Sequence, residues 1–227
     1  MTAYFISGLG ADEKIFNNIV LPDSISVKHV HWIEPLPKET LQHYCSRLLA
    51  QIDQTEEFVL IGLSFGGMVA IELSKMLRPQ KIIIISTVAT HHEFPLQFRL
   101  AKALHLTSII PPAVLKIQNP LSTWFFSVKT KDEKELLRYF LKNVTPNYLR
   151  WSMNAVLNWK NERRPDNLVH IHGNDDRIFP VGRTHADYII KDTGHFMVYD
   201  QAEKISKLLT LLICEAPAQD LRSTNDA

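Results

Sequence analysis

The sequence predicts an α/β fold in which helices flank a mostly parallel sheet of about six strands, interrupted by an all-helical insert. Before residue 90, short apolar segments alternate with segments of helical periodicity. This alternation is typical of parallel strands joined by crossover helices. From residue 90 to 164 only helical segments are found, after which strand-like segments resume. The insert therefore interrupts a single α/β core.

Six segments are expected to form the strands. They are residues 3–6, 26–33, 57–63, 81–87, 167–171 and 186–190. The first, third and fourth of these are continuous apolar runs, as in strands that are covered on both faces. The second alternates with the period of two that marks a strand.

Apolar residues at helical spacing predict the helices. In the core these are residues 39–52, 65–77 and 201–215, with a short helix at 12–20 capped by Asp12. In the insert they are residues 95–106, 131–143 and 146–159. The pairs Pro111-Pro112 and Asn119-Pro120 are expected to be turns between insert helices.

This pattern divides the chain into a core, a cap and a tail. The core is expected to comprise residues 1–89 and 165–215, and the helical cap residues 90–164. Residues 216–227 are polar and are expected to form a flexible tail.

Composition excludes several classes of function. The chain has 25 basic and 24 acidic residues and a net charge of +1, without the basic patch that a nucleic-acid-binding protein needs. The longest apolar run, residues 82–85, is too short to span a membrane. Cys45 and Cys214 each lie in an expected helix and are interpreted as buried packing thiols. With no secretory signal recognised at the N-terminus, a cytoplasmic protein is expected. The oligomeric state is left open.

No cofactor or metal is expected. The His, Asp and Glu residues show no ligand spacing such as H-E-x-x-H. Gly8-Leu9-Gly10 lacks the third glycine of a dinucleotide-binding loop.

One motif indicates covalent catalysis. Gly62-Leu63-Ser64-Phe65-Gly66 fits G-x-S-x-G and lies where a buried strand meets a helix. A nucleophile elbow occupies that junction, in a strained turn that projects the serine hydroxyl above the sheet. Glycine is needed two residues before and after the serine because side chains there would collide. Ser64 is therefore the candidate nucleophile.

A serine hydroxyl needs a base, and ten histidines could supply it. His195 is selected because it lies in the loop between the last expected strand and the final helix. In the order Ser, Asp, His, the orienting carboxylate lies between the other two. Two adjacent candidates, Asp175 and Asp176, follow the strand at 167–171, and Asp176 is preferred.

These motifs together resemble the α/β-hydrolase superfamily up to about residue 215. The elbow maps to residues 62–66, the H-G-x-x-D-x-x-x-P acid loop to residues 172–180, and the C-terminal G-H to Gly194-His195. The resemblance implies a Ser64–His195–Asp176 triad. It also implies an oxyanion hole made by the backbone amides of Leu9 and Phe65.

Two departures from the family pattern accompany this resemblance. Ser7-Gly8 stands where many members carry His-Gly, and the chain begins almost at once with the strand that is usually third, so the N-terminal hairpin is expected to be missing. The insert resembles the helical cap of many members, which closes a largely apolar pocket over the sheet.

The function expected first is hydrolysis of a carboxylic ester, or a related acyl bond, of a small molecule through an acyl-enzyme. Lyase or C–C bond chemistry on the same triad is an alternative, as is a non-catalytic receptor for a small ligand. Arg99 and Arg150 could bind a substrate carboxylate, although a solvated helix face is the simpler interpretation. Cap aromatic residues such as Trp151 either line the pocket or pack the cap on the sheet.

Overall fold

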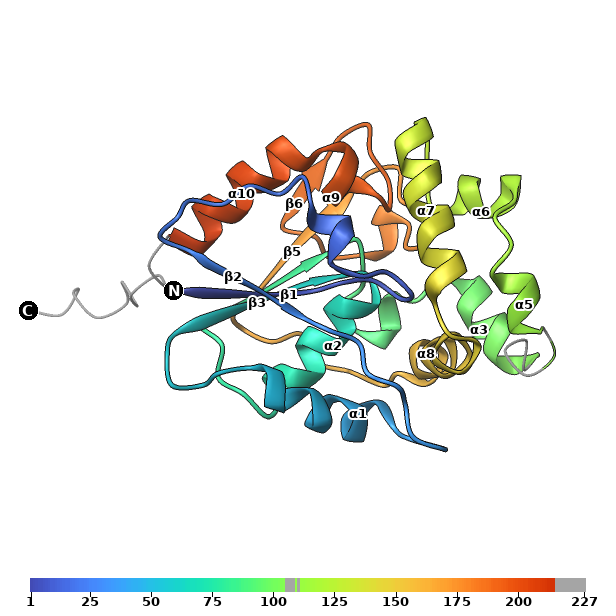
Figure 1. Cartoon of the computed structure of the whole chain (residues 1–227), viewed down its shortest axis with the longest axis horizontal. Coiled ribbons are helices and arrows are strands. Elements are labelled where there is room, and N and C mark those ends of the chain that lie inside the picture. The colour runs from blue at the N-terminus through green and yellow to red at the C-terminus, as the bar shows by residue number, and fades with distance from the viewer. Residues whose placement is uncertain (105–108, 110, 215–227) are drawn as a thin grey trace, which may run out of the picture.

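A computed structural model of the chain describes residues 1–104, 109 and 111–214, and the expected tail at 216–227 lies outside this range. Within these residues, six strands form one parallel sheet in the order β2-β1-β3-β4-β5-β6 (Figure 1). The strands are β1 Thr2–Ile6, β2 Ser26–Val30, β3 Phe58–Leu63, β4 Lys81–Ile85, β5 Leu168–Gly173 and β6 Tyr188–Ile190. The predicted fold class is confirmed.

The strand order creates a switch point between β1 and β3. From β1 the chain moves outward to β2, then returns past β1 to β3 and continues in the other direction to β6. Loops that leave neighbouring strands in opposite directions leave a crevice at the carboxyl ends of those strands. The loop after β1 and the turn after β3 meet at this crevice.

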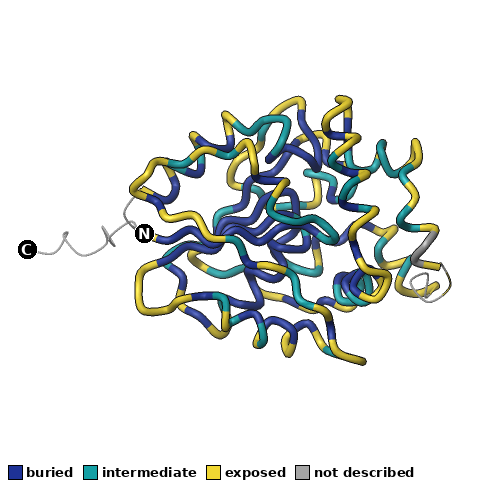
Figure 2. The backbone as a smooth tube through the Cα atoms, in the orientation of Figure 1, coloured by how far each residue is buried: buried dark blue, intermediate teal, exposed yellow. Residues whose placement is uncertain are grey.

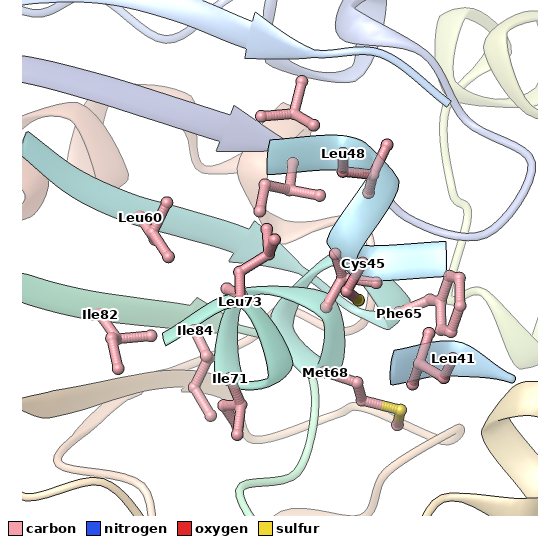
Figure 3. Close-up of a cluster of buried hydrophobic side chains, with 14 of the residues drawn as sticks. Leu41, Cys45, Leu48, Leu60, Phe65, Met68, Ile71, Leu73, Ile82 and Ile84 are labelled. Atoms are coloured by element: carbon pink, nitrogen blue, oxygen red, sulfur yellow. The ribbon is translucent and has the colours of Figure 1, made fainter. Parts of the chain in front are cut away.

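Alternate residues of the strands face two separate apolar cores. Tyr4, Leu60 and Ile82 point toward α1 (Leu41–Leu48) and α2 (Phe65–Ser74), the side drawn in Figure 3. Phe5 and Ile61 point the other way, toward α10 (Ala202–Cys214). Burial on both faces explains why these strands read as continuous apolar runs. The 3-10 helix η1 (Glu13–Phe16) and α9 (Met197–Asp200) complete the second side.

All the regular secondary structure in the described residues of the insert is helical. After the 3-10 helix η3 (His91–Glu93) the insert contains α3 Leu96–Ala103, α5 Pro112–Leu115, α6 Pro120–Phe125, α7 Lys131–Asn143 and α8 Pro146–Asn158. The prediction of turns at Pro111-Pro112 and Asn119-Pro120 was wrong, because Pro112 and Pro120 each begin a short helix. Proline suits this place because the first helical N–H has no partner inside the helix. Asn119 caps α6 in a capping box with Ser122.

Other corrections concern element lengths. The helix expected at 12–20 is only η1, although Asp12 caps it as predicted. The second strand stops at Val30 because its neighbour β1 ends at Ile6, which pairs with it. The core helices are shorter than expected, and 3-10 helix η2 (Leu49–Gln51) continues α1.

The two cysteines differ. Cys45 is fully buried between α1 and the sheet, as expected, but Cys214 is exposed at the last turn of α10. Among the described helices, none is long and apolar enough to cross a membrane.

Candidate active site

Ser64 occupies a strained turn between β3 and α2. Its backbone has φ 53° and ψ −119°, a left-handed φ that non-glycine residues rarely adopt. Two hydrogen bonds hold the turn: Ser64 N donates to Ile85 O at 2.8 Å, and Gly67 N donates to Ser64 O at 2.9 Å. Strain of this kind persists only where the surroundings enforce it, and it is common at functional sites.

The glycines that flank Ser64 are required by backbone contact, as predicted. A Cβ atom on Gly62 would lie 2.3 Å from Gly66 O. A Cβ atom on Gly66 would lie 2.2 Å from Ile6 O and 2.3 Å from Ser7 O. The elbow is therefore packed directly against the end of β1, and no larger residue fits at either position.

A chain of hydrogen bonds links the three residues selected from the sequence. Ser64 Oγ lies 2.9 Å from His195 Nε2, and His195 Nδ1 lies 2.9 Å from Asp176 Oδ2. A carboxylate can only accept, so Nδ1 carries the imidazole proton and Nε2 accepts from the serine hydroxyl. His195 and Asp176 are 4% and 3% exposed, so the hydrogen bond between them is shielded from water, whereas the bond to Ser64 is only partly buried.

The second carboxylate oxygen of Asp176 fixes the acid in place. Oδ1 accepts from the N–H groups of Ile178 and Phe179 at 2.9 and 3.0 Å. The neighbouring Asp175 has an exposed side chain, and its backbone N–H donates to Thr193 O. The structure thus brings Asp176, and not Asp175, to His195.

Asp176 is held as a carboxylate. Burial alone would raise its pKa, but the charge and hydrogen bond of His195, with smaller contributions from His172 and Phe179 N–H, outweigh burial and lower the pKa below its usual value. The acid is therefore ionised at neutral pH while buried beside an imidazole.

Two further histidines lie behind Asp176 and were not singled out from the sequence as site residues. His172 Nε2 is 2.7 Å from Phe179 O and 3.6 Å from Asp176 Oδ2, and His172 Nδ1 is 3.0 Å from His170 Nε2. Both rings are fully buried, and burial lowers both pKa values, that of His170 to about 3. Their i, i+2 spacing in β5 puts them on one face of the sheet, which is the signal that could have paired them.

The loop after β1 lies beside Ser64, where the oxyanion hole was expected. A Cβ atom on Gly8 would be 3.5 Å from Ser64 Cβ. Trp32, which the sequence had placed in a strand, fixes this loop: its indole N–H lies 3.2 Å from Gly8 O and 3.0 Å from Ala11 O. Over the described part of the chain, neither the Leu9 N–H nor the Phe65 N–H has a hydrogen-bond acceptor.

Residues of the helical insert contact the core near this site. Trp151 donates to Glu39 O at 2.9 Å and packs on Tyr44 and Phe65, so its role in the structure is to join the cap to the core. Arg99 and Arg150 are exposed, as expected for solvated helix faces. The buried Tyr148 hydroxyl has no hydrogen-bond partner among the described residues.

A cavity of about 230 Å³ lies between the loop after β1 and the cap helices α7 and α8. Its walls include Gly10, Ala11, Trp32, Val144 and Tyr148. The cavity adjoins the Leu9 loop rather than the triad itself. Within the described residues no group of three or more His, Cys, Asp or Glu side chains is arranged to hold a metal ion.

Comparison with known proteins gives the family. A model of the alpha/beta hydrolase family matches residues 20–208. Among curated proteins no match is found. Solved structures with a similar fold include an esterase from Exiguobacterium antarcticum (16% identity, TM-score 0.70, covering 95% of this chain and 92% of that one) and MenH from S. aureus (14% identity, TM-score 0.71, covering 94% and 93%). Another is Est816, described as an N-acyl homoserine lactone degrading enzyme (16% identity, TM-score 0.66, 92% of each chain).

At these identities the structural likeness shows the fold alone. The family model, in contrast, spans most of the sequence, from before β2 into α10. On that evidence, the chain belongs to the alpha/beta hydrolase family.

Proposed function

We propose that this protein is a serine hydrolase that cleaves a carboxylic ester, or a related acyl bond, of a small molecule. The observation that carries the proposal is the continuous hydrogen-bond chain from Ser64 through His195 to Asp176. Two of the similar structures, an esterase and a lactone-degrading enzyme, have names consistent with acyl chemistry.

In the proposed mechanism, Ser64 Oγ attacks the acyl carbon while His195 Nε2 takes its proton. Asp176 keeps the Nδ1 proton in place and stabilises the imidazolium that forms. His195 then returns the proton to the leaving alcohol, and water attacks the acyl-enzyme by the same route in reverse.

The amides of Leu9 and Phe65 are proposed to bind the oxyanion. Phe65 N–H lies at the first turn of α2, where unpaired N–H groups favour negative charge. Trp32 supports this role by holding the carbonyls on either side of the Leu9 loop. A donor of this kind contributes about 3 kcal/mol to the transition state.

The cavity beside Leu9 is proposed to accept part of the substrate. Its volume is below the roughly 300 to 1,000 Å³ of sites for drug-sized ligands, which favours a short acyl or alcohol group. Tyr148 forms part of its wall, although the Tyr148 hydroxyl itself is buried.

The test is covalent labelling with a fluorophosphonate, followed by mass mapping, together with the burst of nitrophenolate from p-nitrophenyl butyrate. We expect one adduct, on Ser64, and loss of both adduct and burst in Ser64→Ala and His195→Ala. Ser86→Ala is the matched control, since Ser86 also has a positive φ, of 51°, but is fully buried. Absence of labelling and of turnover over a broad acyl panel would falsify the proposal.

A further inference from the structure

Exposed apolar side chains are concentrated in one stretch of the helical insert, on α3, α5, α6 and the residues between them. Of the sixteen large hydrophobic residues that are exposed in the described part of the chain, eight lie between residues 96 and 124. They are Leu96, Leu100, Leu104, Ile109, Val114, Ile117, Leu121 and Trp124, each between 52% and 68% exposed. We call these eight residues the apolar face. Single exposed apolar residues are normal on a protein surface, but a concentration like this marks an interaction site.

The helices that carry this face are not covered by the rest of the described structure. Neither α3 nor α6 contains a buried residue. On α3 the exposed leucines recur at every fourth position, from Leu96 to Leu104, and form one stripe. Helices α3, α5 and α6 lie together at the end of the molecule opposite the N-terminus (Figure 1), where Figure 2 shows mainly exposed and intermediate backbone.

The charge of this segment is one-sided. Residues 94–131 contain five basic residues, Arg99, Lys102, Lys116, Lys129 and Lys131, and no Asp or Glu. The rest of the chain has 20 basic and 24 acidic residues. The net charge of +1 is therefore the sum of a basic segment and a larger part of the chain that is acidic. Exposed apolar residues combined with Lys and Arg are the composition of helices that lie on anionic membranes.

We propose that the apolar face docks on an anionic lipid surface, with the apolar side chains in the headgroup region and the basic residues near lipid phosphates. A second copy of the chain fits less well as the occupant. A two-fold interface would place the same patch against itself and bring like charges together.

Aromatic side chains connect the helices of this face to the candidate catalytic histidine. On the inner side of α3, Phe98 lies 5.2 Å from the ring of Phe179, which lies 6.0 Å from the ring of His195. Phe126, at the end of α6, lies 5.7 Å from His195. Docking would therefore bring the membrane close to His195, which makes a lipid-dissolved ester a candidate substrate. This last consequence rests on the proposed function, whereas docking does not.

The experiment is flotation with large vesicles, either of neutral phosphatidylcholine or with about one-third phosphatidylglycerol. We expect the wild-type chain to float with the anionic vesicles, less well with neutral ones, and less at high salt. Combining Leu96→Ser, Leu100→Ser and Leu121→Ser should reduce the bound fraction about ten-fold. The matched control combines Val20→Ser, Leu36→Ser and Leu211→Ser, which are 73%, 47% and 50% exposed on other elements and should leave binding unchanged.

A pair of charge variants tests the electrostatic part. Arg99→Gln with Lys116→Gln should remove most of the preference for anionic vesicles, whereas Lys160→Gln with Lys191→Gln should not. The proposal is overturned if the wild-type chain does not float, or if the apolar-face variant floats like its control. It is also overturned if the face instead forms a dimer, detected by sedimentation and abolished by the same three substitutions. Ser64→Ala should float like the wild type, so failure of the catalytic proposal is separable from failure of docking.

Discussion

Two buried carboxylates in this protein show how the hydrogen-bond donors around a carboxylate determine its role. Asp176, 3% exposed, lies at the carboxyl end of β5, and Glu72, 2% exposed, lies on α2. Asp176 accepts from two backbone N–H groups and from His195, which reaches Ser64. Glu72 accepts from Trp159 Nε1 at 2.7 Å and from Lys75 Nζ at 2.8 Å, and neither partner leads to a reacting group.

The two carboxylates differ because their hydrogen-bond donors differ in whether they can take part in proton transfer. An imidazole can accept a proton and return it, so in the proposed reaction the carboxylate beside His195 stabilises the charge that appears on the ring. Trp159 and Lys75 only donate hydrogen bonds to Glu72. Glu72 instead joins α2 to the end of the cap, since Trp159 directly follows α8.

The largest expected effect comes from Asp176→Asn. The amide would present a donor to His195 Nδ1 and favour the wrong tautomer, so kcat should fall by roughly 10⁴-fold. Esterase assays with p-nitrophenyl butyrate measure this loss. Asp175→Asn is the control, because that side chain is exposed. A loss below ten-fold for Asp176→Asn would contradict its proposed role.

Glu72→Gln should show the opposite pattern. Loss of the charge-assisted bonds to Trp159 and Lys75 should lower the free energy of unfolding by about 1 to 3 kcal/mol, with kcat per folded molecule nearly unchanged. Lys75 is 47% exposed, so most of this loss should come from the indole bond. Urea unfolding of Glu72→Gln and Trp159→Phe tests the comparison, and Lys75→Gln should have the smaller effect. A collapse of kcat without loss of stability would show that Glu72 is more than an anchor.

A smaller effect, of pH on stability, is expected from the buried histidines behind Asp176. His170 contacts His172 there, and the pKa of His170 is lowered to about 3 in the folded chain, from an ordinary value of 6.5. Between these values the unfolded chain binds a proton that the folded chain does not, so stability decreases as pH falls. His170 alone should contribute a loss of about 2 kcal/mol between pH 7 and pH 5.

This contribution is measured by comparing urea unfolding at the two pH values in wild type, His170→Leu and the exposed control His92→Gln. The His170 variant should have a flatter pH profile, whereas His92→Gln should match the wild type. An unchanged slope in His170→Leu would mean that its ring is not held neutral by burial.

The elements best predicted from the sequence are those with a strong local pattern. Strands β3 and β4 were found because parallel strands buried on both faces are continuous apolar runs. The largely exposed β2 was found instead from its alternation. Helix α7 was placed at residues 131–143, where a Thr130–Glu133 capping box and amphipathic spacing mark its start and course. The short helices α5 and α6 were missed because a turn of helix carries too few residues for a period to be recognised.

The sequence by itself determined the strand–helix order and the residue types at the ends of β3 and β5, which include Ser64 and Asp176. The element order and these residue types depend on residues close together in the sequence, so local sequence patterns are enough to predict them. The sequence also favoured Asp176 over Asp175, whereas tertiary structure alone decided that Trp32 holds the Leu9 loop. Tertiary structure also decided that the cap leaves an apolar face uncovered. Each of these depends on which distant segments come into contact, and residue spacing along a chain does not encode those contacts.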